Sequence, residues 1–106
     1  MRLIMLIREK DKDIIIKIAK KTLKTPCQLL AYGSRVSGEA HDISDLDMVI
    51  LSNNGEKLDI EEFINFKEEL LDSSIPILIQ LSDWNRIPKS FHKNIISNNE
   101  EIIRIN

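Results

Sequence analysis

The spacing of apolar residues along the chain predicts three helices. In residues 11–23, apolar side chains recur at helical spacing, and lysines occupy much of the remaining helix surface. A second helical pattern covers residues 60–71, and Asp59 in front of it is a suitable N-cap. Pro88 fits the first turn of a third helix, whose apolar residues extend to Ile96. Between these segments lie apolar runs of a different kind.

These shorter runs predict strands. Residues 27–32 are apolar and lie between a proline and a glycine, as expected of a buried strand. Residues 45–52 form a second run, which ends at a turn rich in Asn and Gly. Residues 77–81 predict a third strand and residues 101–106 a short last one. The first seven residues fit either an edge strand or an early helical turn.

The composition predicts one domain. A chain of 106 residues with 42% hydrophobic content supplies one compact core, and it is too short for a second domain. We therefore expect residues 1–106 to form a single domain, with a core motif in residues 27–84 and an uncertain structure for residues 1–10. Fifteen Lys and Arg against seventeen Asp and Glu give a net charge of −2. No global field then favours binding to a nucleic acid polymer or to a membrane.

Two further features bear on location. The apolar start of the chain is closed by Arg8, Glu9 and Lys10 after about seven residues, which is too short for a signal core or a membrane span. Cys27 is the only cysteine, so an internal disulfide is impossible, and a small buried hydrophobe is its expected role. We expect a cytoplasmic protein.

Asp45 and Asp47 are the first candidates for chemistry. In a strand, side chains at positions i and i+2 share a face, so the two carboxylates project together from Cα atoms roughly 6.6 Å apart. Adjacent carboxylates resist ionising together unless a cation lies between them, which makes the pair a natural anchor for Mg²⁺.

The Gly33-Ser34-Arg35 segment at the end of the first strand offers the complementary groups. Gly33 allows a phosphate to approach the backbone, Ser34 contributes a hydroxyl, and Arg35 carries a charge suited to phosphate oxygens. Taken singly, Gly-Ser after a strand is usually a turn, and Asp-x-Asp is common where strands begin. A calcium loop would need a central Gly and a terminal Glu, and a P-loop would need Gly-Lys-Ser/Thr, so both are excluded.

The combination resembles a known signature. Gly33-Ser34, ten residues and then Asp45-Leu46-Asp47 is similar to the Gly-Ser-x10-Asp-x-Asp motif of the minimal nucleotidyltransferase (MNT) family. These proteins are relatives of DNA polymerase beta and the aminoglycoside nucleotidyltransferases. The resemblance extends through LLAYGSRVSGEAHDISDLDMVILS and SDWNRIPKSFHKNI. It implies an α/β (α+β) nucleotidyltransferase fold, in which helices flank a small mixed β-sheet.

The resemblance also implies an activity. Asp45 and Asp47 would be catalytic metal ligands in a two-Mg²⁺ site, and Gly33, Ser34 and Arg35 would bind the nucleotide. The expected reaction is in-line attack of a hydroxyl on the α-phosphorus of ATP or another nucleoside triphosphate. Many family members act as antitoxins that transfer AMP from ATP to a tyrosine of a helical HEPN-domain partner.

Gln80 departs from the family pattern. Members usually have a third carboxylate three residues before the Asp-Trp pair, which is Asp83-Trp84 here, and Gln80 occupies that position. Its amide oxygen can bind Mg²⁺, but it carries no charge and cannot act as a base. Asp83 could replace it only across a β-bulge, because positions 80 and 83 face opposite ways in a regular strand. The second metal is therefore in doubt.

Three functions stay open at this point. The first is an active nucleotidyltransferase that modifies a HEPN partner, and the second is a catalytically weakened antitoxin or binding subunit that lacks the third carboxylate. A free-standing enzyme acting on a small molecule is disfavoured, because the chain is too short for an acceptor-binding domain. Among the other residues, we expect His92 at the surface and both Trp84 and Phe91 in the core.

Overall fold

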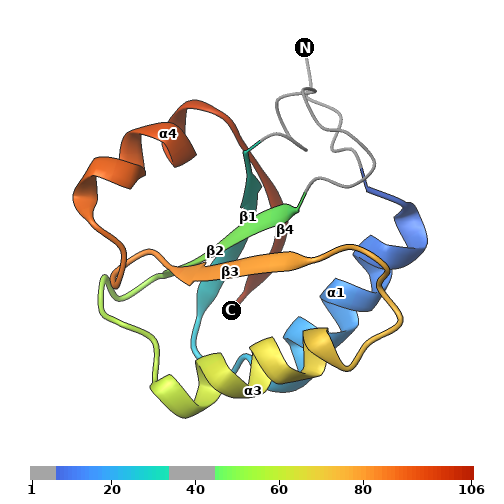
Figure 1. Ribbon diagram of the computed structural model, residues 1–106. Coiled ribbons are helices and arrows are strands. Elements are labelled where there is room, and N and C mark those ends of the chain that lie inside the picture. The colour runs from blue at the N-terminus through green and yellow to red at the C-terminus, as the bar shows by residue number, and fades with distance from the viewer. Residues whose placement is uncertain (1–6, 34–44) are drawn as a thin grey trace.

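The computed structural model describes residues 7–33 and 45–106 (Figure 1). Ser34 and Arg35 therefore lie outside the described residues, as do most of the first seven residues. The helices are α1 (Glu9–Thr22), α3 (Ile60–Leu71) and α4 (His92–Ser97), which follows the 3₁₀ turn η1 (Lys89–Phe91). The strands are β1 (Cys27–Tyr32), β2 (Leu46–Ser52), β3 (Ile79–Asp83) and β4 (Asn99–Ile105).

The four strands form one mixed sheet in the order β3-β2-β1-β4. The central strand β1 runs antiparallel to both β2 and β4, whereas β2 and β3 are parallel. The parallel pair is connected through α3, because parallel neighbours need a crossover connection. The predicted mixed sheet flanked by helices is confirmed.

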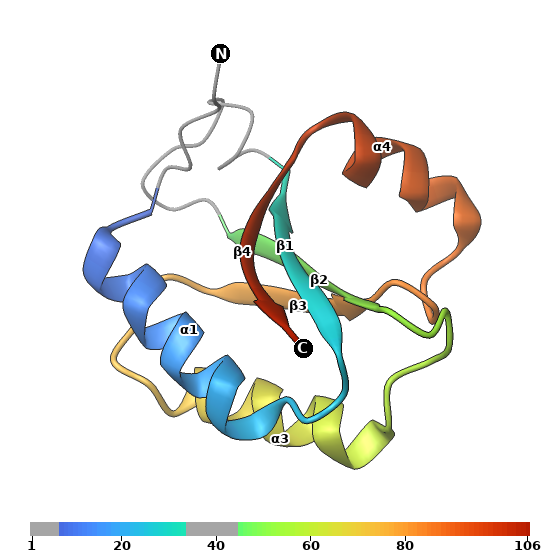
Figure 2. The same cartoon turned by 180° about the vertical axis from the view of Figure 1, so that it is seen from behind.

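Helices cover both faces of the sheet, but unequally. Helices α1 and α3 lie side by side on one face, and α4 lies on the other, as Figures 1 and 2 show from opposite sides. The face under α1 and α3 carries the larger core, whose fully buried members include Ile15, Leu29, Met48, Ile50 and Phe66. The face under α4 carries a smaller core of Leu30, Val49 and Ile95.

Most element boundaries agree with the sequence pattern. The Asp59 side chain accepts a hydrogen bond from Glu62 N at 3.2 Å and so caps α3 as predicted. The third strand, predicted at residues 77–81, begins and ends two residues later because β2 pairs with it only from Leu46 opposite Ile79 onward. None of the helices in the described part of the chain is long and apolar enough to cross a membrane.

Three single-residue expectations had different outcomes. Cys27 is buried, and burial, followed by the charge of Glu62, raises the pKa of its thiol to about 11. It is the small buried hydrophobe that was predicted. Phe91 is 52% exposed, so its assignment to the core was wrong. His92 is not a free surface residue: its ring stacks on Trp84 with centroids 3.6 Å apart, and Nε2 donates to the Trp84 carbonyl at 2.9 Å.

Candidate functional site

The candidate site forms where β1 ends and β2 begins. Because these strands are antiparallel, the end of one lies beside the start of the other, and Tyr32 pairs with Asp47. The next residue, Gly33, is thereby brought against the Asp47 side chain. Gly33 and Asp47, which come from the two halves of the sequence motif, thus meet at one end of the two inner strands.

Gly33 is required there for two physical reasons. Its φ is +82°, in the left-handed region that favours glycine. A Cβ at this position would lie 2.5 Å from Asp47 Oδ2, which is closer than real Cβ contacts. From the sequence, we expected Gly33 to allow a phosphate to approach the backbone. The structure adds that the space beside its Cα is taken by the Asp47 carboxylate.

Asp45, Asp47 and Gln80 lie together on the sheet face that carries α4. Asp47 pairs with Gln80 in the parallel β2–β3 ladder, so their side chains share a face. Gln80 Nε2 donates a hydrogen bond of 3.3 Å to Asp45 Oδ2. The expectation that Gln80 faces the aspartate pair is confirmed by this contact. Turning the amide over would present its carbonyl oxygen at the same place.

The electrostatics of the pair suit a cation. Partial burial, and after it the negative charge of Asp45, raise the pKa of Asp47. Neither aspartate forms an ion pair within the described residues. A cation between the carboxylates would remove their repulsion, so the residues present fit a divalent ion. In the described ranges, however, no three His, Cys, Asp or Glu residues gather around a common point, since position 80 is an amide.

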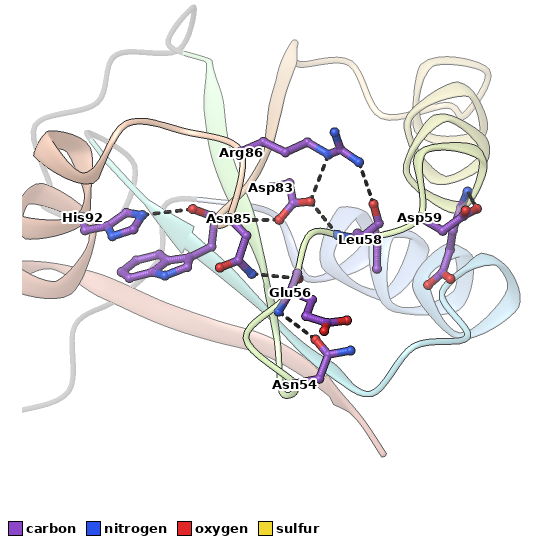
Figure 3. A network of polar contacts seen from close by, with 10 residues as sticks. Asn54, Glu56, Leu58, Asp59, Asp83, Asn85, Arg86 and His92 are labelled. Carbon is purple, nitrogen blue, oxygen red and sulfur yellow. Dashed lines mark hydrogen bonds and ion pairs between the residues drawn. The ribbon is translucent and has the colours of Figure 1, made fainter.

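Asp83 does not supply the missing carboxylate. It is 2% exposed and turned to the opposite face, where Oδ2 accepts from Leu58 N at 2.8 Å and Oδ1 accepts from Asn85 N at 3.0 Å (Figure 3). Arg86 Nε pairs with it at 3.3 Å and Nη2 donates to the Leu58 carbonyl. These bonds tie the segment before α3 to the end of β3. The bulge that would bring Asp83 to the metal is absent from this ladder.

Tyr32 and Ser82 belong to the site but were missed from the sequence. Burial and the charge of Asp47 raise the pKa of Tyr32, whereas its hydrogen bond with Ser82 lowers it. The Tyr32 side chain thus reaches from β1 to Ser82 on β3, beside Asp47. A signal for both was available: Tyr32 directly precedes Gly33, and Ser82 lies two positions after Gln80 on the same strand face.

The family follows from this fold and motif. A family model described as Polymerase beta, Nucleotidyltransferase matches residues 11–106. The chain belongs to this family. Nucleotidyltransferases of this family normally use a divalent metal, which agrees with the adjacent Asp45 and Asp47 carboxylates.

A curated relative agrees with the family assignment. The chain is 35% identical over 81 residues to the "Probable protein adenylyltransferase MntA" of Haemophilus influenzae. The match covers 76% of this chain and 69% of that protein.

Solved structures agree on the fold. A crystal structure of a toxin-antitoxin with AMP-PNP has a TM-score of 0.70 at 18% identity, covering 87% of this chain and 72% of that one. A structure of tri-AMPylated Shewanella oneidensis HEPN toxin in complex with MNT antitoxin has a TM-score of 0.62 at 16% identity, covering 92% and 72%. At these identities the likeness establishes the fold alone.

Proposed function

We propose that residues 1–106 act as one Mg²⁺-dependent nucleotidyltransferase domain, which transfers AMP from ATP to a hydroxyl group of a HEPN-domain partner and serves as its antitoxin. The observation that carries the proposal is the Asp45 and Asp47 pair on one sheet face beside Gln80, with Gly33 packed against Asp47. The adenylyltransferase name of the Haemophilus relative and the HEPN complexes of the structural neighbours support the nucleotide and the partner.

Within this proposal Asp45 and Asp47 hold the metal, and the carbonyl oxygen of Gln80 is a neutral third ligand. Gly33, Ser34 and Arg35 bind the nucleotide phosphates. When bound, the ion neutralises phosphate charge and polarises the α-phosphoryl group. The aspartates contribute by holding their carboxylates in place, since Asp47 is fixed between Gly33 and the β3 strand.

The acceptor hydroxyl oxygen forms a bond to the α-phosphorus, the bond from that phosphorus to the bridging oxygen breaks, and pyrophosphate leaves. The hydroxyl proton must pass to water or to a group of the partner, because the neutral amide of Gln80 cannot accept it. Asp45, Asp47 and Gln80 therefore support nucleotide binding better than they support deprotonation of the acceptor.

A second function is favoured by one specific observation. Gln80 occupies the third-carboxylate position beside Asp45, and Asp83 is engaged on the other face. An antitoxin that neutralises its partner mainly by contact, with slow or no transfer, would have this site.

The deciding experiment incubates the purified chain with ATP labelled at the α-phosphate and Mg²⁺, with and without the co-expressed HEPN-domain partner. Label on the partner that Asp47→Ala abolishes supports the transferase. A stable complex on size exclusion with no label supports the contact antitoxin. Neither label nor complex at micromolar concentration would refute both functions, since a specific interface typically buries roughly 1,200–2,000 Å² in total.

A further inference from the structure

A pocket of about 200 Å³ lies between the sheet and α4, next to the aspartate pair. Its lining comes from β1, β3, the loop after β3, η1 and α4: Tyr32, Ser82, Ile87, Phe91 and Asn94. Whole-ligand sites are usually 300–1,000 Å³, so this pocket has room for a fragment of a nucleotide rather than for all of it.

The pocket begins where the metal site ends. Tyr32 is the pairing partner of Asp47, and Ser82 lies two residues beyond Gln80 on the same strand face. Two residues along a strand span roughly 6.6 Å, which is about the reach of a ribose between a phosphate and a base. A nucleotide with its α-phosphate at the aspartates would thus place its base in the pocket, with the Tyr32 and Ser82 hydroxyls near the sugar.

The lining suits a planar base with a particular hydrogen-bond pattern. Phe91 lines the pocket with its side chain 52% exposed, so the ring is accessible to a ligand, and Ile87 supplies an apolar wall. Asn94 carries one acceptor and one donor group side by side. Adenine offers the matching donor at N6 and acceptor at N7, whereas guanine offers two acceptors at O6 and N7.

We propose that this pocket holds the nucleobase of the substrate, that Phe91 stacks on it, and that Asn94 selects adenine over guanine. The inference rests on the proposed nucleotidyltransferase function and assigns its nucleotide specificity. The ring stack of His92 on Trp84 fixes the start of α4, and so positions Phe91 and Asn94 over the sheet.

The test measures Mg²⁺-dependent binding of ATP, GTP and inorganic tripolyphosphate by calorimetry to the full chain, to four variants of η1 and α4, and to Asp47→Ala. Phe91→Ala should weaken ATP binding roughly 5- to 100-fold, the usual effect of losing one base–aromatic stack, and Phe91→Trp should restore it. Asn94→Leu should reduce the preference for ATP over GTP by roughly 5- to 100-fold. Ile96→Ala, which alters a 66% exposed side chain of the same helix outside the pocket, should change neither. Tripolyphosphate should bind all four variants equally.

The outcomes separate the pocket from the underlying function. If Phe91→Ala and Asn94→Leu bind ATP and GTP as the unaltered chain does, while Asp47→Ala binds neither, the pocket assignment is overturned and the nucleotidyltransferase site stands. If the unaltered chain binds neither nucleotide nor tripolyphosphate with Mg²⁺, both assignments fail. Equal loss of ATP and tripolyphosphate in Phe91→Ala would also overturn the pocket, because the defect would then not concern the base.

Discussion

Gln80 is the residue on which the strength of the proposed transfer depends. Its side chain already contacts Asp45, so a carboxylate at position 80 would add a third negative group on the face that carries Asp45 and Asp47. We expect Gln80→Asp to raise AMP transfer by ~10²–10⁴, the usual contribution of a general base. The measurement is the initial rate of labelling of the partner from α-labelled ATP.

Gln80→Asn is the matched control, since it is equally short but neutral, and it should not raise the rate. Brisk transfer by the unaltered chain that Gln80→Asp leaves unchanged would contradict the assignment. The third carboxylate would then have to come from the partner, because Asp83 is engaged elsewhere.

Asp47 should make the stability of the metal-free protein depend on pH. Its pKa is raised in the folded state, so ionising it is harder than in the unfolded chain. The stability linked to its protonated form is present below the usual pKa of aspartate and is lost as pH rises through the folded pKa. In chelator, Asp47→Asn should therefore raise the melting temperature at pH 7 and lose this advantage at acid pH. If the difference in melting temperature between the two proteins were the same at every pH, the surroundings of Asp47 would not destabilise its carboxylate.

Within the described residues, Gly33 and Gly55 both have positive φ and give a matched pair. Gly33→Ala places a methyl group against Asp47 Oδ2, whereas nothing lies within 4 Å of a Cβ at Gly55. Gly55→Ala should cost about 1–2 kcal/mol from the backbone alone. Gly33→Ala should cost more and also weaken Mg²⁺ binding, because Asp47 must move. Thermal melts with and without Mg²⁺ measure both effects. Equal losses of stability and of Mg²⁺ binding in the two variants would show that the close approach of Gly33 to Asp47 has no effect.

At the scale of elements, Asp83 joins the segment before α3 to the end of β3. Removing its carboxylate leaves Leu58 N and Asn85 N without their acceptor, and we expect Asp83→Ala to cost about 2–4 kcal/mol. Asp59→Ala, which removes only the exposed N-cap of α3, should cost about 1 kcal/mol. Denaturant unfolding measures both. A folded Asp83→Asn variant should still bind Mg²⁺. A loss of Mg²⁺ binding in this variant would indicate that Asp83 is a metal ligand.

The elements also indicate how far the sequence could be interpreted. Helix α3 and strand β1 have the predicted bounds, because their apolar periods and their Pro, Gly and Asp boundaries are local signals. The facing of Gln80 followed from strand parity once Asp83-Trp84 had fixed the alignment.

What could not be predicted depends on contacts between distant segments. Asp83 is buried because Leu58, twenty-five residues earlier, donates to it, and His92 is held by Trp84 across the loop before η1. Phe91 is apolar and follows a helix signal, yet only packing against the sheet decides whether such a residue is covered. No periodicity in the sequence carries that information.

At the scale of the whole molecule, the two faces of the sheet should differ in local stability. The face under α1 and α3 carries the larger core, whereas α4 packs on the sheet mainly through its own Ile95, which contacts the smaller core with Leu30 and Val49. Amide hydrogen exchange should therefore be faster in α4 than in α1, because less apolar surface must be exposed to open it. Saturating ATP with Mg²⁺ should slow exchange in α4 selectively if the base pocket is correctly assigned. Uniform exchange in both helices would contradict this difference.

The pairing of Gln80 with Asp47 has a consequence for how the protein can change by mutation. Glutamine and glutamate codons differ by a single base, and the two side chains have the same length and shape. Position 80 is exposed at the start of an edge strand, so the exchange disturbs no packing. A lineage carrying this gene is thus one point mutation away from a third carboxylate beside Asp45, and the same step in reverse removes it. One mutation could therefore change the rate of the proposed transfer while the fold and the Asp45 and Asp47 pair stay the same.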